Sequence, residues 1–216
     1  MNPAPRPTPG SDDNARPRRI VVATGNPHKL DEIRAVLAAA GVEVTLESMR
    51  EHGVEAPPED GETFAANALI KARACAAATG LDAVADDSGL EVDALDGAPG
   101  VHSARYAGVH GDDAANNAKL VAALADVPPA ERTARFVCAA ALVTADGAEH
   151  VEVGRMPGRI IDTPRGAHGF GYDPHFVADA ADGRTNAELS GAEKDAISHR
   201  GAAFAALARR LTCDVG

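Results

Sequence analysis

The order of hydrophobic patterns in this 216-residue chain predicts an α/β fold, on three observations. A β-branched run at 19–24, apolar residues at helical spacing over 28–40 and a second strand-like run at 42–46 indicate two parallel strands joined by a helix. Segments at 132–144 and 148–160 flank an Asp-Gly pair, a strong tight-turn signal, and therefore indicate an antiparallel hairpin. A hydrophobic share of 45% in a chain of this length supports one globular domain around a mixed sheet.

The other elements are expected in chain order. The first helix ends at Gly41, because glycine readily adopts the left-handed conformation that follows a helix. A polar loop over 49–61 comes next, and a short buried strand at 83–87 is followed by a glycine-rich stretch, 88–100. Apolar residues at helical spacing predict the remaining helices at 63–79, 112–124 and 198–211.

The charge and composition exclude several classes of function. Acidic residues outnumber Lys and Arg by 32 to 21, so a net charge of −11 should repel nucleic acid and anionic membrane lipid. Aromatic residues make up only 3% of the chain, and no apolar run is long enough to span a membrane. Phosphate-loop, dinucleotide-binding, zinc-protease and nucleophile-elbow motifs are absent. Any phosphate that binds must therefore meet a local cationic pocket.

The cysteines and the N-terminal segment bear on location. Cys75, Cys138 and Cys213 are far apart and odd in number, which favours reduced thiols in a cytoplasmic protein. Residues 1–18 are rich in proline and polar residues and contain no apolar segment, so a disordered leader is expected rather than a secretion signal. The folded domain is expected to span 19–216.

The sequence TGNPHK joins the first strand to the first helix. A helix N-terminus is already electropositive through its unpaired N–H groups, so His28 and Lys29 in the first turn are unfavourable for stability alone. At an anion site, Lys29 would add a mobile positive charge, and Thr24 and Asn26 would add hydrogen-bonding groups. An ordinary strand–helix turn with Pro27 at the first helical position accounts for the pattern equally well.

The start of the final helix repeats this pattern. Ser198 is a good N-cap, yet His199 and Arg200 again place cations against the helix dipole. Two cationic helix starts in one acidic protein favour a shared polyphosphate ligand. Lys194, just before this helix, would join them, although a single lysine is commonly only solvated.

One face of the helix at 63–79 interrupts an apolar stripe with two polar residues. Phe64, Asn67, Lys71 and Cys75 share this face. Lys71 either extends along the apolar surface to water or reaches a cleft in which an anion compensates for its burial.

Asp86 and Asp87 end the strand expected at 83–87, where alternation sends their side chains to opposite faces. Ligands gather at the carboxyl ends of strands in α/β sheets, so one of these carboxylates suits a Mg²⁺ ligand or a general base. The alternative is that both cap the turn that follows.

Five segments resemble, in their order along the chain, the inosine/xanthosine triphosphate pyrophosphatase family. They are TGNPHK (24–29), GETFAANALIKA (61–72), ADDSGLEVDALDGAPGVHSARYAG (85–108), GFGYDP (169–174) and EKDAISHRG (193–201). The resemblance covers nearly the whole chain from Arg19. It implies an elongated, two-lobed α/β fold with a mixed sheet flanked by helices, the nucleotide in the cleft between the lobes, and a homodimer.

The resemblance also implies roles for individual residues. Asp87 is the implied catalytic carboxylate, and Glu59 and Asp87 are the implied Mg²⁺ ligands. The triphosphate would contact the strand–helix turn and three further side chains, in full Thr24, Gly25, Asn26, Pro27, His28, Lys29, Lys71, Ser88 and Arg200. The purine base would occupy a pocket of Phe170, Gly171, Tyr172, Asp173, Lys194 and His199.

The implied activity is Mg²⁺-dependent hydrolysis of ITP, dITP and XTP to the monophosphate and pyrophosphate, which removes these nucleotides from the pool. Two positions depart from the family pattern: Ala66 replaces an acid that many relatives carry, and His168 replaces a small residue. One alternative is a related pyrophosphatase whose preferred base is a modified pyrimidine or that acts on a standard nucleotide. Another is a nucleotide-binding regulatory module without catalysis, for which Ala66 is the only hint.

Overall fold

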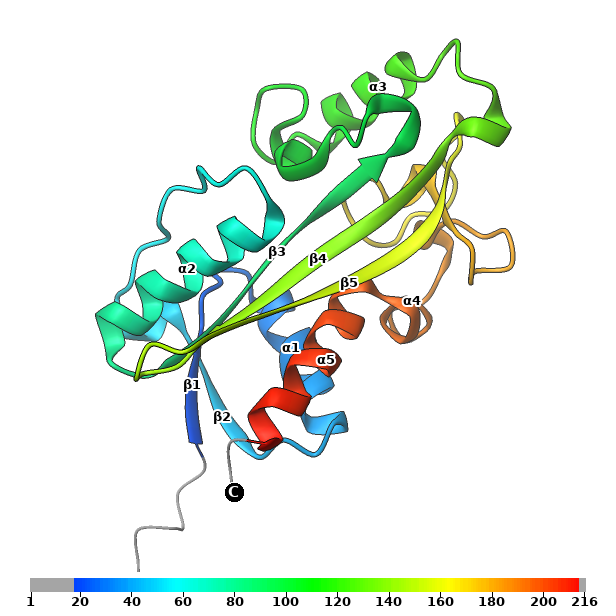
Figure 1. The fold of residues 1–216 in the computed structure, drawn as a ribbon. Helices are drawn as coiled ribbons and strands as arrows, with labels where there is room; N and C mark the ends of the chain where they lie inside the picture. Colours follow the sequence, from blue (N-terminus) through cyan, green and yellow to red (C-terminus); the bar gives the residue numbers. More distant parts are fainter. Residues whose placement is uncertain (1–17, 214–216) are drawn as a thin grey trace, which may run out of the picture.

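A six-stranded mixed sheet forms the centre of the computed structural model, which describes residues 18–213 except for the side chains of His28 and Cys213 (Figure 1). The strands are β1 (Arg18–Val22), β2 (Val44–Ser48), β3 (Asp82–Val92), β4 (Thr133–Val143), β5 (Glu149–Ile160) and β6 (Phe176–Ala178). Their order across the sheet is β2-β1-β3-β4-β5-β6. β1 pairs in parallel with β2 and β3, and the other neighbours are antiparallel. The predicted parallel pair and hairpin are both confirmed.

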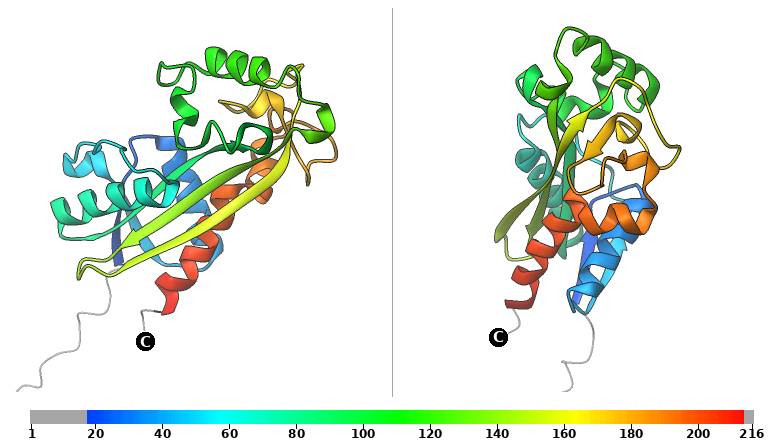
Figure 2. Two further views of the ribbon diagram at one scale, coloured as in Figure 1. Left: turned by 45° about the horizontal axis from the view of Figure 1, so that its top comes forward. Right: turned by 90° about the vertical axis from the view of Figure 1, so that its right-hand side faces the viewer.

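Helices cover both faces of this sheet. In residues 18–213 they are α1 (Pro27–Ala39), α2 (Phe64–Thr79), α3 (Asp113–Ala123), α4 (Gly191–Ile197) and α5 (His199–Cys213). α2 packs on one face, whereas α1 and α5 pack side by side on the other (Figure 2). None of these helices has the length and apolar character needed to cross a membrane.

The long strands β3, β4 and β5 connect two lobes. At one end they pack between α2 and the pair α1 and α5, and at the other end they pack against α3 and the segment around β6 (Figure 1). On the α5 side, the core under α1 and α5 centres on Ile33 and Phe204, and the core under α3 centres on Leu120 and Phe176. Between the two cores, β3 carries the polar residues Asp86 and Ser88 on this face.

The edge of β3 is open where its polar residues begin. β1 pairs with β3 only as far as Val22 and Val84, and the segment around Pro99 meets the same edge again only at Glu91. Between these points, in the part of the chain that the structure describes, no strand pairs with that edge of β3 at 85–88. A ligand at the carboxyl end of β1 can therefore reach both faces of β3.

Several boundaries differ from the expectations. β3 continues through Gly89 to Val92 instead of ending at Asp87, and the short elements β6 and α4 were not expected. Arg18 is the first residue of β1, so the folded part begins one residue earlier than predicted. The prediction of a disordered leader otherwise falls on residues 1–17, outside the described residues.

Candidate active site

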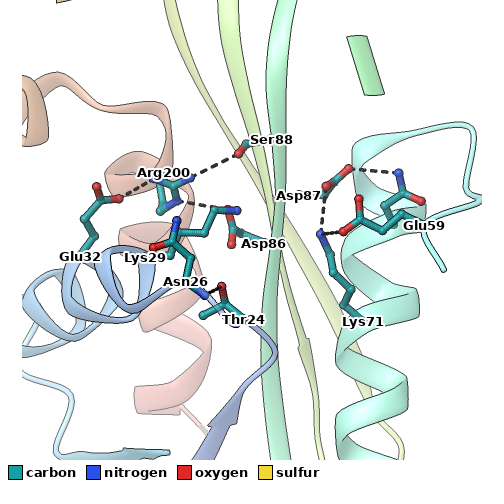
Figure 3. Close-up of polar contacts among 11 residues, drawn as sticks. Thr24, Asn26, Lys29, Glu32, Glu59, Lys71, Asp86, Asp87, Ser88 and Arg200 are labelled. Atoms are coloured by element: carbon teal, nitrogen blue, oxygen red, sulfur yellow. Dashed lines mark hydrogen bonds and ion pairs between the residues drawn. The ribbon is translucent and has the colours of Figure 1, made fainter. Parts of the chain in front are cut away.

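β3 carries three polar residues in succession, Asp86, Asp87 and Ser88, just beyond its pairing with β1. Side chains alternate along a strand, so Asp86 and Ser88 face α1 and α5, and Asp87 faces α2 (Figure 3). The prediction that the two aspartates face opposite sides is confirmed. The site therefore presents a different set of groups on each side of β3.

On the side of β3 that faces α1 and α5, the buried carboxylate of Asp86 forms ion pairs with two cationic side chains. Lys29 Nζ donates to Asp86 Oδ2 at 2.9 Å, and Arg200 Nε donates to the same oxygen at 3.1 Å. Burial alone would raise the pKa of Asp86, but the charges of Lys29 and Arg200 hold it well below its usual range. Arg200 also donates to Glu32 and, at 3.3 Å, to the hydroxyl of Ser88. Asp86 thus stays ionised and fixes both cations beside the end of β1.

These contacts account in part for the cationic starts of α1 and α5. Lys29 lies in the first turn of α1 and Arg200 in the first turn of α5, and both are compensated by the single buried carboxylate of Asp86. The two helix starts therefore converge on one place, which is the geometry that a shared polyphosphate requires. The ligand itself stays a prediction.

On the second side, Lys71 of α2 links two carboxylates. Its Nζ donates to Glu59 Oε1 at 2.9 Å and to Asp87 Oδ1 at 3.0 Å, while Asn67 Nδ2 donates to Asp87 Oδ2 at 3.2 Å. Burial alone would lower the pKa of Lys71, but Asp87 and Glu59 outweigh it and raise the pKa. Lys71 is only 7% exposed, and the two carboxylates compensate for the burial of its charge. Its predicted contact with the triphosphate stays a prediction.

The environment of Asp87 disfavours its charge. Burial raises the pKa of Asp87, Lys71 and Asn67 act against this rise, and the nearby charge of Glu59 adds to it. A carboxylate with a raised pKa is a stronger base once it is ionised, which suits the removal of a proton from water.

Glu59 and Asp87 fit a magnesium ion as two oxygen ligands. Lys71 Nζ contacts both carboxylates, so both are directed toward one point that already holds a positive charge. Mg²⁺ is commonly held by one or two carboxylates together with water and substrate phosphates. Residues 18–213 contain no group of three or more His, Cys, Asp or Glu side chains that would form a complete metal site.

A cavity on the Asp86 side of β3 connects the phosphate region to the predicted base pocket. Ser88 and Arg200 line it together with every predicted base-pocket residue, Phe170, Gly171, Tyr172, Asp173, Lys194 and His199. Its lining also includes residues that were not predicted: Gly89, Ser103, Ala104, Asp113 and Phe136. Asp87, Lys71 and Glu59 lie on the other side of the open β3 edge and are not part of this lining.

His199 forms part of the cavity wall as a neutral ring. It stacks on Phe136, with ring centroids 5.2 Å apart and ring planes at 19°. Burial lowers the pKa of His199 to about 3, and the charges of Arg200 and Lys194 contribute to the shift. Its Nδ1 is buried and has no hydrogen-bond partner among the residues that the structure describes, so this atom could bind a polar group of a ligand.

The loop at 169–173 holds an exposed ring over a network of polar groups. Phe170 is 62% exposed, and Lys194 Nζ lies 4.9 Å from its ring centroid. Asp173 accepts hydrogen bonds from the Phe170 N–H at 3.0 Å, from Asn186 Nδ2 at 3.2 Å and from Lys194 Nζ. A flat ring beside fixed polar groups suits a heterocyclic ligand that forms hydrogen bonds.

The turn between β1 and α1 lies at the open edge of β3. Thr24 Oγ1 accepts the N–H of Asn26 at 3.1 Å, and Pro27 is the first residue of α1, as predicted. Arg50, which was not predicted, lies against this turn, because a Cβ built on Gly25 would be 2.9 Å from a terminal nitrogen of its guanidinium. The available signal was its place just after β2, since the carboxyl ends of parallel strands share one edge.

The two departures from the family pattern lie outside the cavity. His168 is exposed and does not line it. Ala66 lies in the first turn of α2, where its N–H donates to Thr63 Oγ1 at 3.1 Å.

The fold and the site together define an α/β protein with a polar cleft, lined by paired cations and carboxylates, at the carboxyl ends of parallel strands. The chain belongs to the Ham1 family, whose model matches residues 20–210. A protein of Frankia alni named dITP/XTP pyrophosphatase is 57% identical over 198 residues, which cover 89% of this chain and 96% of that protein. A Mycolicibacterium paratuberculosis protein of the same name is 58% identical, with coverage of 89% and 95%.

Solved structures show the same fold. A HAM1 protein from Coxiella burnetii superimposes with a TM-score of 0.83 at 43% identity, covering 90% of this chain and 98% of that chain. A Mycobacterium abscessus structure described as a nucleoside-triphosphatase and dITP/XTP pyrophosphatase gives 0.74 at 54% identity, with coverage of 88% and 97%. The predicted α/β fold and the family are therefore confirmed.

Proposed function

We propose that this protein hydrolyses the non-standard purine nucleoside triphosphates ITP, dITP and XTP to the monophosphate and pyrophosphate. The observation that carries the proposal is the single cavity in which the base-pocket residues meet Ser88 and Arg200, beside the open edge of β3. Relatives named dITP/XTP pyrophosphatase at 52–58% identity support the same substrate class.

The proposed reaction uses groups from both sides of β3. Lys29 and Arg200 hold the triphosphate beside the end of β1, so that its α-phosphorus lies at the open edge. Asp87, oriented by Lys71 and Asn67, takes a proton from a water molecule whose oxygen attacks the α-phosphorus. The bond from this phosphorus to the bridging oxygen breaks, and pyrophosphate leaves with the electron pair. A Mg²⁺ ion at Glu59 and Asp87 would supply neutralisation of the phosphate charge.

Base selection is assigned to Lys194 and His199. A 6-keto oxygen accepts hydrogen bonds and therefore suits the ammonium group of Lys194, whereas a 6-amino group is itself a donor. The unpartnered Nδ1 of neutral His199 gives the cavity a second polar contact. A site with buried polar groups strongly rejects a ligand that leaves them unpaired.

We further propose that the protein acts in the cytoplasm as a homodimer on free nucleotides, without binding nucleic acid or membranes. Cys75 and Cys138 are buried free thiols, which fits a reducing compartment. The net charge of −11 fits the absence of polyanionic partners. Light scattering during size-exclusion chromatography tests the dimer.

The direct test measures pyrophosphate and inorganic phosphate in parallel, from ITP, dITP, XTP, GTP and ATP, with and without Mg²⁺. We expect pyrophosphate from ITP, dITP and XTP, little product from GTP or ATP, and loss of activity on chelation. Inorganic phosphate as the direct product, or equal rates on ATP, would contradict the proposal. Nucleotide binding without any turnover would favour the regulatory module.

A further inference from the structure

The exposed ring of Phe170 depends on its neighbour Gly171 for its position. Gly171 has a φ of +60°, a left-handed conformation that favours glycine. The loop at this point therefore has no side chain of its own with which to pack. Contacts that hold the Gly171 backbone therefore act together with those of Asp173 and Lys194 in fixing the orientation of Phe170.

Both backbone groups of Gly171 are held by α3. The Gly171 N–H donates to Asp113 Oδ2 at 2.7 Å, and Asn117 Nδ2 donates to the Gly171 carbonyl at 2.8 Å. Asp113 and Asn117 are four residues apart on a helix, so their side chains lie on the same face of α3. Asn117 Nδ2 also donates to the backbone carbonyl of Asp113 at 2.9 Å, which restricts its rotamer.

A third contact extends this attachment to the next residue. The hydroxyl of Tyr172 donates to the backbone carbonyl of Ser103 at 2.8 Å, in the 3₁₀ segment Gly100–Arg105 that precedes α3. This segment and α3 are themselves joined, because Asn116 Nδ2 of α3 donates to the backbone carbonyl of Ala104 at 3.4 Å. One side of the base pocket is thus attached to α3 and its preceding turn.

We propose that Asp113 and Asn117 are positioning residues that set base selectivity by holding Gly171, and thereby the ring of Phe170, against the cavity. The proposal rests on the proposed function for its substrate, but the attachment itself is a property of the fold. Asp113 also lines the cavity, so release of this contact would alter the base pocket directly. The hydrogen bonds of Asp87 with Lys71 and Asn67, and that of Arg200 with Asp86, do not involve Asp113 or Asn117 and should persist in these variants.

The test compares Asp113→Ala and Asn117→Ala with a matched control, Asp112→Ala. Asp112 is the N-cap of α3, and its side chain accepts the N–H of Ala115 at 3.0 Å without touching Gly171. For the two positioning variants we expect KM for ITP to rise about tenfold with kcat nearly unchanged, and the preference for ITP over ATP to fall. Asp113→Asn keeps an acceptor oxygen and should restore most of the wild-type KM.

A second readout does not depend on activity. The chain contains no tryptophan, so Phe170→Trp introduces a single tryptophan, whose emission can be excited selectively over that of Tyr106 and Tyr172. We expect acrylamide quenching to increase when Asp113→Ala is added to this background and to stay unchanged when Asp112→Ala is added.

The outcomes separate the two proposals. Wild-type protein that releases no pyrophosphate from ITP would overturn the proposed function, whereas the quenching experiment would still test the attachment. An equal effect of Asp112→Ala and Asp113→Ala on KM and quenching would overturn the positioning role, because it would reflect general weakening of α3. Unchanged KM, selectivity and quenching in the folded Asp113→Ala protein would also overturn it.

Discussion

Asp86 and Asp87 are adjacent in the chain, yet their environments shift their pKa values in opposite directions. Asp86 lies beside Lys29 and Arg200, which lower its pKa, whereas burial raises the pKa of Asp87 despite its contact with Lys71. Ionised Asp86 therefore stabilises the folded state, and ionised Asp87 destabilises it. Perturbed carboxylates of the second kind are common at catalytic positions.

Asp87→Asn should raise thermal stability at pH 7 while it abolishes most turnover. The folded-state pKa of Asp87 lies above the unfolded value, so its favourable contribution is present below the unfolded pKa and is lost as pH rises through the folded pKa. The amide of the Asp87→Asn variant is neutral at every pH, so at pH 7 the variant does not bear the cost of a buried charge at this position. Removal of a general base typically lowers kcat by about 10²–10⁴-fold. Calorimetry at pH 7 and a pyrophosphate-release assay measure the two effects.

Asp86→Asn is the matched control, for which we expect thermal stability at pH 7 to fall. The pKa of Asp86 is depressed, so its stabilisation is present above the unfolded pKa and is lost as pH falls through the folded pKa. Its replacement leaves Lys29 and Arg200 without their shared buried acid, and loss of one partner from a buried ion pair costs about 3–5 kcal/mol. If both variants lowered the melting temperature at pH 7, the inference that ionised Asp87 destabilises the folded state would be wrong.

At the scale of elements, the close approach of α5 to β5 places His199 and Arg200. Gly154 of β5 lies directly beneath the start of α5, where an added Cβ would be 2.1 Å from the His199 carbonyl oxygen and 2.6 Å from Ala203 N. Only glycine leaves room for this approach. The position of two site residues is therefore set by the absence of a side chain on a neighbouring strand.

Gly154→Ala should displace the start of α5 and impair both stability and activity. Overpacking of this kind typically costs about 1–3 kcal/mol, and kcat/KM should fall because Arg200 moves away from Asp86 and Ser88. Gly191→Ala is the control, since a Cβ on Gly191, at the start of α4, meets nothing within 4 Å. Chemical denaturation and steady-state kinetics test the pair, and equal behaviour of the two variants would contradict the prediction.

Local patterns predicted most elements, and the failures have local causes. The buried face of α2 and the β4–β5 hairpin follow from periodicity and from one turn signal. The predicted end of β3 was too early because Gly89 resembles a loop residue in the sequence. In the structure, Gly89 lies within β3 at the point where Ser103 and Gly100 approach the strand. α4 was missed although Ser190 and Glu193 form a capping box that is visible in the sequence.

The contacts of the site were less accessible to prediction. The cationic helix starts were recognised from the sequence, but Asp86 lies 57 residues from Lys29 and 114 residues from Arg200. Local sequence spacing gives no indication that one buried acid pairs with two cations so far away in the chain. The attachment of Gly171 to α3, across 58 residues, is likewise set by topology.

At the scale of the whole molecule, the strands β3 to β5 make the two lobes one structural unit (Figure 1). The cavity takes its lining from both lobes, with Arg200 from α5 and Asp113 from α3. His199 and its stacking partner Phe136 belong to this junction, between the core under α5 and the core under α3. A charge introduced there would affect the packing of both lobes.

Acid unfolding of the molecule should therefore include a contribution from His199. Its folded-state pKa of about 3 is depressed from 6.5, so the stability it contributes is present above pH 6.5 and is lost as pH falls toward 3. His199→Phe should flatten the dependence of Tm on pH between about 6.5 and 4. Scanning calorimetry measures this slope. The exposed His168, changed to Phe, is the control, and an unchanged slope in His199→Phe would refute the expectation.

The alternation of Asp86 and Asp87 also constrains how many residues β3 can have before Asp86. β3 and β4 are paired from Ala83 with Val143 to Val92 with Ala134, so the facing of every β3 side chain depends on its parity along the strand. Insertion of one codon just before Asp86 would turn this acid toward Lys71 and Asp87 toward Lys29 and Arg200. Each acid would still lie near a cation, so charge pairing would be largely kept. The two acids would, however, have exchanged their environments and therefore their chemical roles. In β3, whether a position is odd or even therefore decides which side of the site its side chain faces.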